Sequence, residues 1–442
     1  MDREKLNQIA SAYENELFCY NPELAMYFGR NNVEHDKFKD HSLKATYAWQ
    51  RTEDNFLYQL NQLSENNLKN FPEYLTYRLL RQTLIDNKKI RICKEELWNI
   101  NPQTVNAYDF WQSSLMMLAE KQPIGKEEYR KFALKRWETF PEVVKDEIDN
   151  LKEGLALGFS APRCIVQVFL NSLKSILHSS IINSPYFDFA RRDDDTKFKQ
   201  AVEELIKVKI NPSIQKYTHF LENEYLIAAR NEIGINSLPC SDEGYIAKLQ
   251  KETTLNIQAN EIFQYGIEYM KELEEEIVSI GYKIFKTKSL EEIFRLAKSE
   301  PQFRFHSEEE ILKYNRLALA RAYNRMPLWF KNIPKSNCII KPFSAHFGQM
   351  GTVAEYHPPN LDEQSPGIFY INTYAPGEQN RLNHEAVLFH ELIPGHHYQT
   401  ALLYEADLYH SLNKYLWHNG YDEGVIPPFI AVSKSKNLGC LR

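Results

Sequence analysis

Three histidines and a glutamate lie within one short segment near the end of the chain, HELIPGHHYQ at 390–399. Neutral imidazoles and carboxylates are the usual ligands of a hydrolytic zinc ion, which also needs an open position for water. His390 followed directly by Glu391 places a ligand and a proton acceptor in the order of the HExxH motif. The residue types therefore indicate a zinc site with Glu391 as general base.

The second histidine is not where the HExxH motif requires it. The position one helical turn after His390 is Pro394, which cannot bind a metal. In a regular helix His396 would lie about 240° around the axis from His390, and His397 about 10.5 Å further along it. Pro394 and Gly395 predict a kink or bulge at this point. Such a distortion would bring either His396 or His397 beside His390, and the residues alone leave both open.

The segment resembles the hallmark of a bacterial family grouped as "domain of unknown function 885", which is HExxPGHHxQ followed by a downstream Glu-Gly. Both parts occur here, as HELIPGHHYQ and as YDEG at 421–424. The family is similar to the helical gluzincins, which include angiotensin-converting enzyme, thimet oligopeptidase and carboxypeptidase Taq. The resemblance implies a mainly α, zincin-like fold with a deep cleft and a small β element. Supporting matches span most of the chain: NPELAMYFGRNN (21–32), LKEGLALGFSAPR (151–163), ARNEIGINSLPCSDEGYIAKLQKETT (229–254) and SPGIFYINTYAP (365–376).

The resemblance also implies a role for each residue of the site. In such gluzincins a Gly-His pair supplies the second ligand and a glutamate further along the chain supplies the third. The zinc ligands would then be His390, His396 and Glu423, with Glu391 polarising the water. His397 would be a reserve ligand or a donor to the oxyanion. Further candidates are Glu385, as a partner that orients a ligand histidine, and the groove-lining residues Tyr370, Asn372, Tyr374 and Arg381.

By this resemblance we expect a zinc metallopeptidase that acts on short or unfolded peptides. Two alternatives stay open: an inactive paralogue or peptide-binding module without turnover, and a metal-dependent amidase with a non-peptide substrate. The first alternative is motivated by the end of the chain. Family members continue from Glu-Gly-Trp into an amphipathic helix and a long further segment, whereas this chain reads EGVIPPFIAVSKSKNLGCLR (423–442). The sequence therefore predicts a truncated domain with an aberrant tail at 425–442.

The elements that must position the site are mainly helical up to about residue 330. Two capping boxes mark helix starts, Ser289 with Glu292 and Ser307 with Glu310. Apolar residues recur at helical spacing over 256–280, with charged residues between them. These patterns predict a helical body.

The pattern changes between 326 and 376, where prolines and glycines become frequent. Two β-like runs, CIIKPF (338–343) and GIFYINTY (367–374), predict a small hairpin or an edge strand beside the cleft. No linker is evident in the sequence. We therefore expect one domain over 1–442, composed of a helical body (1–330), a catalytic segment (331–424) and the tail.

Composition limits the partners of the chain. A net charge of −6 gives no basic face for nucleic acid. The mean hydropathy is −0.52, and no window of the sequence approaches the ~18–20 apolar residues that a membrane span needs. The N-terminus, MDREKLNQIASAYENEL, lacks the apolar stretch of a secretory signal, so we expect a cytoplasmic protein whose partner is a peptide substrate. The cysteines show no close pair, which indicates reduced thiols without a disulfide framework: Cys19, Cys93, Cys164, Cys240, Cys338 and Cys440.

Overall fold

The computed structural model describes residues 2–28, 30, 35–100, 111–343, 353–359, 365–406, 410–416 and 418–424. Within these ranges the chain is mainly helical, as expected, with one small sheet. It divides into two compact units, Met1–Lys251 and Glu252–Arg442, where the sequence indicated one domain. The boundary falls inside a helix, Ser241–Thr253, so no linker composition marks it.

The first unit is a helical assembly around an aromatic core. The buried indole of Trp137 stacks on Phe189, with ring centroids 5.5 Å apart, and lies 5.7 Å from the ring of Tyr186. Burial of each such large apolar side chain contributes about 1.5–3 kcal/mol to the stability of the folded chain. The α-helices of this unit are α1 (Asp2–Tyr20), α2 (Pro22–Tyr27), α3 (Leu43–Asn61), α4 (Glu73–Ile90), α5 (Trp111–Lys121), α6 (Glu127–Glu138), α7 (Phe140–Ala156), α8 (Arg163–His178), α9 (Asp188–Arg191), α10 (Thr196–Leu205), α11 (Asn211–Phe220), α12 (Leu226–Ala228) and α13 (Ser241–Thr253).

The second unit combines helices with the sheet. Both predicted caps are confirmed, because Ser289 accepts a hydrogen bond from the N–H of Glu292 (3.3 Å) and Ser307 accepts one from the N–H of Glu310 (3.1 Å). The elements of this unit are α14 (Ala259–Phe285), α15 (Leu290–Ser299), α16 (Glu308–Arg325), β1 (Cys338–Pro342), β2 (Ala354–His357), β3 (Gly367–Ile371), α18 (Arg381–Glu391), α19 (His396–Glu405) and α20 (Asn419–Asp422).

The sheet has the strand order β1-β3-β2. The two strands expected from the sequence are present, but they pair in parallel, with Cys338 opposite Gly367, and do not form a hairpin. The third strand, β2, was not expected and runs antiparallel to β3, with Tyr356 opposite Phe369. The fully buried Phe369 packs with Leu388 in the core between the sheet and the helices.

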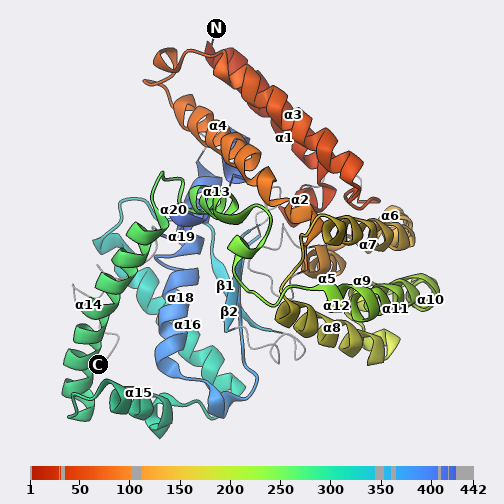
Figure 1. Ribbon diagram of the computed structural model, residues 1–442. Coiled ribbons are helices and arrows are strands. Elements are labelled where there is room, and N and C mark those ends of the chain that lie inside the picture. Colours follow the sequence, from red (N-terminus) through yellow and green to blue (C-terminus); the bar gives the residue numbers. More distant parts are fainter. Residues whose placement is uncertain are drawn as a thin grey trace. The chain divides into compact units, whose positions relative to one another are not determined.

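Helices α16 and α18 pack against each other and against this sheet, α16 on β1 and α18 on β2 (Figure 1). This packing fixes α18, the helix that carries the His-Glu pair. None of the helices in the described part of the chain combines the length and apolar character that a bilayer span requires.

Candidate metal centre

The helix that carries His390 ends one residue later, at Glu391, and the next helix begins at His396. Pro394, whose peptide bond to Ile393 is cis, lies between them. Gly395 passes so close to α18 that a Cβ atom there would lie 1.7 Å from the carbonyl oxygen of His390. Only glycine fits this approach. The predicted distortion is therefore a complete break between two helices.

The break brings His396 beside His390, with ring centroids 4.7 Å apart and ring planes inclined by 77°. Glu423 follows α20 directly. Its Oε2 lies 3.4 Å from His390 Nε2, and its Oε1 lies 3.5 Å from His396 Nε2. One ligand atom from each of the three side chains lies within 4.8 Å of the other two. The structure thus brings together the three residues expected to bind zinc.

These donors fit a zinc ion. Zinc–nitrogen and zinc–oxygen bonds of about 2.0–2.2 Å in a tetrahedral site place neighbouring ligand atoms about 3.4 Å apart. The two histidine–carboxylate separations, 3.4 Å to Oε2 and 3.5 Å to Oε1 of Glu423, are close to this spacing, and one ligand atom from each of the three side chains lies within 4.8 Å of the other two. The Glu423 side chain is 52% exposed, so solvent reaches this ligand. Two imidazoles and a carboxylate are also a common ligand set of catalytic zinc.

The charges of the cluster stabilise one another. Hydrogen bonds from His390 and His396 lower the pKa of Glu423 to about 2. The same contact with Glu423 raises the pKa of His390, although burial opposes this shift. Burial raises the pKa of Glu391, and the two neighbouring histidines act in the opposite direction. Glu391 is therefore close enough to the cluster to interact electrostatically with it, and its raised pKa suits a proton acceptor.

One member of a hydrogen-bonded pair of residues, Asp422, lies directly beside Glu423 in the chain. The buried Asp422 accepts hydrogen bonds from the side-chain amide of Gln399 (2.6 Å) and from the backbone N–H of His418 (2.7 Å). Burial raises the pKa of Asp422 to about 6. We did not identify this pair from the sequence, although Gln399 closes the HExxPGHHxQ motif and Asp422 stands in YDEG.

His397 is not part of the cluster. Its Nδ1 accepts a hydrogen bond from the hydroxyl of Tyr356 (3.0 Å), and its Nε2–H donates to the carbonyl of Ser336 (3.1 Å). The ring is fully buried, and this burial lowers its pKa to about 4. The expectation that His397 is a reserve ligand or an oxyanion donor does not fit, because both ring nitrogens are used. Its observed contacts tie α19 to β2 and to the segment before β1.

Two further candidates have structural partners. The carboxylate of Glu385 pairs with Arg321 and accepts a hydrogen bond from the hydroxyl of Tyr314 (2.8 Å), so its observed partners do not include a ligand histidine. Arg381 pairs with Glu310 and lies over the ring of Phe305, 4.8 Å from its centroid. These contacts join α16 to the start of α18. Both residues therefore help to position the helix of the site, which differs from the roles expected for them.

The remaining groove candidates lie on β3 and in the loop that follows it. Tyr370 packs edge-on against the ring of His357, with centroids 4.9 Å apart. The buried Asn372 accepts a hydrogen bond from the backbone N–H of Tyr374, whose side chain is exposed. Their described contacts are thus with the sheet and its loop.

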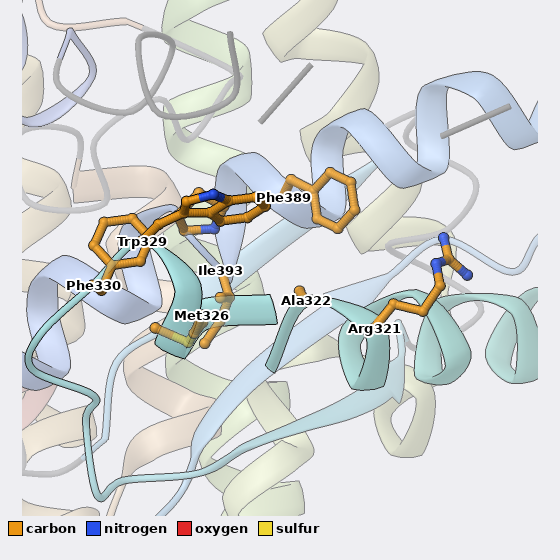
Figure 2. Close-up of a pocket in the computed structure, with 8 residues that line it drawn as sticks. Arg321, Ala322, Met326, Trp329, Phe330, Phe389 and Ile393 are labelled. Atoms are coloured by element: carbon orange, nitrogen blue, oxygen red, sulfur yellow. The ribbon is translucent and has the colours of Figure 1, made fainter. Parts of the chain in front are cut away.

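A small apolar pocket is formed partly by the same break. Phe389 and Ile393, on either side of His390 and Glu391 in the sequence, line it together with Met326, Trp329 and Phe330 (Figure 2). Phe389 directly precedes His390, so the pocket shares its wall with the segment that carries two of the three ligands.

Comparison with known proteins gives a family and a fold. The profile of the family described as "Bacterial protein of unknown function (DUF885)" matches residues 22–424. No curated protein matches significantly. The fold is similar to that of a proposed lipoprotein from Colwellia psychrerythraea, with a TM-score of 0.87 and 18% identity, over 100% of this chain and 79% of that one. The fold is also similar to that of a proposed lipoprotein of unknown function from Shewanella oneidensis, with a TM-score of 0.63 and 14% identity. This match covers 96% of this chain and 77% of that one. Since the family match spans most of the sequence, the chain belongs to the DUF885 family of bacterial proteins.

Proposed function

We propose that this chain carries the centre of a zinc-dependent peptidase, with His390, His396 and Glu423 as ligands and Glu391 as general base. The observation that carries the proposal is the meeting of the three ligand atoms within 4.8 Å. Three protein ligands leave the fourth position of a tetrahedral site for water. A gluzincin-like fold with a deep cleft belongs to the same proposal, supported by the order of ligands and base along the chain.

The chemistry divides between the ion and the protein. A bound zinc ion supplies Lewis acidity, which polarises a substrate carbonyl and lowers the pKa of a water molecule. Glu391 accepts a proton from the attacking water and passes it to the leaving amine. The burial that raises the pKa of Glu391 makes it a better acceptor than an exposed carboxylate. Asp422 and Gln399 hold α20, and with it Glu423, against α19.

Peptides are the substrate class that the surroundings favour. β2 is the last strand in the order of the described sheet, and α18 packs against it. An extended peptide that pairs with an edge strand makes main-chain hydrogen bonds that do not depend on its sequence. The net charge of −6 disfavours nucleic acid as a partner. Because an apolar pocket lies beside the break, peptides with apolar side chains are the first substrates to test (Figure 2).

The cellular location remains a prediction. The two structural neighbours are proposed lipoproteins, which favours an exported location over the cytoplasm. Cell fractionation distinguishes the two.

Metal content tests the proposal first. Elemental analysis of the purified chain should give about one zinc ion per molecule. His390→Ala and His396→Ala should each lose it. The matched control is His306→Ala in the same unit, whose side chain is exposed, and it should keep the zinc. A wild-type protein without bound zinc after reconstitution would contradict the proposal.

Turnover tests the chemistry. On a panel of fluorogenic peptides, Glu391→Gln should retain zinc and lose about 10²–10⁴-fold in rate, whereas Glu309→Gln, at an exposed position of α16, should behave as wild type. Two results would favour the alternatives named above. Zinc binding with peptide affinity but no hydrolysis indicates a binding module, and hydrolysis of non-peptide amides alone indicates an amidase.

A further inference from the structure

Two cysteines that lie far apart in the sequence meet in the core of the first unit. Cys93 ends the short 3-10 turn Arg91–Cys93, and Cys240 directly precedes α13. Cys93 is 0% exposed and Cys240 is 5% exposed. Both belong to the same buried cluster, together with Leu97, Phe159 and Leu238.

Gly244, in the first turn of α13, makes room for both sulfur atoms. A Cβ atom built at Gly244 would lie 2.5 Å from the Sγ of Cys240 and 3.2 Å from the Sγ of Cys93. The two sulfurs therefore occupy the space that a side chain at this position would take. The thiol of Cys93 also donates a hydrogen bond to the carbonyl of Gly244, at 3.5 Å. A glycine at this position is thus what allows the two thiols to approach each other.

The electrostatics agree with this contact. Burial raises the pKa of the Cys93 thiol to about 12, and the neighbouring Cys240 raises it further through a direct side-chain interaction. Cys93 is therefore protonated at neutral pH, and its reaction with an oxidant is slow, because the thiolate is the reactive form.

We propose that Cys93 and Cys240 are a disulfide-forming pair, which covalently joins the turn after α4 to the start of α13 when a small disulfide such as oxidised glutathione is present. The thiolate of Cys240, the less buried of the two, attacks the small disulfide and releases one small thiol. The thiolate of Cys93 then attacks Cys240 Sγ in the mixed disulfide and releases the second. Two protein thiols and one small disulfide thus yield one protein disulfide and two small thiols.

The other described cysteines are not candidates for this reaction. Cys19 and Cys164 are exposed in the first unit, and Cys338 is buried in the second. No residue of the candidate metal centre takes part, so the inference is independent of the proposed peptidase function. It differs from the sequence-based expectation of unpaired thiols, because only the folded chain brings these two positions together.

The test uses the whole chain under native conditions. The protein is incubated with oxidised glutathione at mildly alkaline pH, quenched with acid, alkylated after denaturation and analysed by mass spectrometry. We expect a mass lower by two hydrogen atoms, a linked peptide pair containing Cys93 and Cys240, and reversal by dithiothreitol. The reaction should accelerate as the pH rises, because the thiolate is the attacking form in thiol–disulfide exchange. Cys93→Ser and Cys240→Ser should each abolish the linked pair, and Cys164→Ser should not.

Three outcomes would overturn the inference, and each is visible in the wild-type chain even if a serine variant fails to fold. The first is that both thiols remain open to alkylation after oxidation. The second is that a stable glutathione adduct forms on either cysteine without closing to the pair. The third is that the linked peptides appear only when the reaction is run in urea, which would show that the folded chain keeps the sulfurs apart.

Discussion

Gln399 donates a 2.6 Å hydrogen bond from its side-chain amide to Oδ1 of Asp422. This bond links α19, which begins with the ligand candidate His396, to α20, which ends directly before Glu423. α20 has 4 residues, and Asn419 at its start donates a hydrogen bond to the carboxylate of Glu252 (2.5 Å). Asp422 ties the other end of α20, since its second oxygen accepts the backbone N–H of His418, and we infer that this bond helps to position the Glu423 carboxylate.

Removing the side-chain amide of Gln399 should weaken zinc binding without unfolding the chain. For Gln399→Ala we expect a zinc affinity about 10–100-fold lower, since partners that orient ligands have effects of this size. The free energy of unfolding of the metal-free chain should fall by only about 1 kcal/mol. Competition with a chromophoric chelator measures the affinity, and Gln302→Ala, at an exposed site, is the control. Equal zinc affinity in both variants would show that other contacts hold Glu423.

Gly395→Ala tests the break between α18 and α19. The added Cβ would meet the carbonyl oxygen of His390 at 1.7 Å, so the backbone must move and the two ligand histidines must separate. We expect a loss of about 1–3 kcal/mol in the free energy of unfolding and the loss of zinc binding. Gly377→Ala is a matched control, because nothing lies within 4 Å of a Cβ at that position. A Gly395→Ala chain that binds zinc normally would contradict the assigned geometry.

His397 and His396 should respond differently to substitution. His396→Ala removes a ligand and should abolish zinc binding with a modest effect on stability. His397→Ala leaves a cavity and two lost hydrogen bonds in the core, and should lower the free energy of unfolding by about 2–4 kcal/mol. Tyr356→Phe removes only the hydroxyl donor and should cost about 1 kcal/mol. Urea unfolding and zinc titration of the three variants separate the two roles, and zinc loss in Tyr356→Phe would argue against a purely structural His397.

Local signals in the sequence predicted local structure well. The Ser289 and Ser307 caps depend on contacts within one helical turn, and the two β-like runs are rich in the β-branched and aromatic residues that favour strands. The pairing of the strands could not be predicted in the same way. β1 and β3 pair in parallel across a long intervening segment, and β2, with four residues, is too short to give a periodic signal.

At the candidate site, too, local features could be predicted from the sequence, whereas contacts between distant parts of the chain could not. The residue types of the HELIPGHHYQ segment indicated a metal site, but the choice between His396 and His397 depends on backbone dihedral angles at 392–395, which no spacing rule supplies. Glu385 was expected to orient a ligand histidine, and Arg381 was expected to line the substrate groove. Their partners, Arg321 and Glu310, come from α16, a distant part of the chain.

His384 gives the second unit a pH-dependent stability. It is 1% exposed, Asn315 donates to its Nδ1 (3.2 Å), and its Nε2–H donates to the side-chain carbonyl of Gln379 (3.2 Å). Both nitrogens are thus satisfied in the neutral ring. Burial lowers the pKa of His384 to about 4, whereas an unfolded histidine titrates near 6.5.

Between these two pKa values the unfolded chain binds the proton and the folded chain does not, so stability falls as the pH is lowered from about 6.5 towards 4. Above that pH window His384 makes its full contribution to the free energy of unfolding. At pH 5 about 2 kcal/mol of this contribution should be lost. Urea unfolding at pH 7 and pH 5 measures the change. In His384→Gln the difference between the two pH values should be smaller by about this amount, while the exposed control His306→Gln should keep the wild-type difference. Since His35, whose pKa burial also lowers to about 4, is present in all three chains, the comparison isolates His384. An unchanged difference in His384→Gln would mean that the folded chain accommodates a protonated ring at this position.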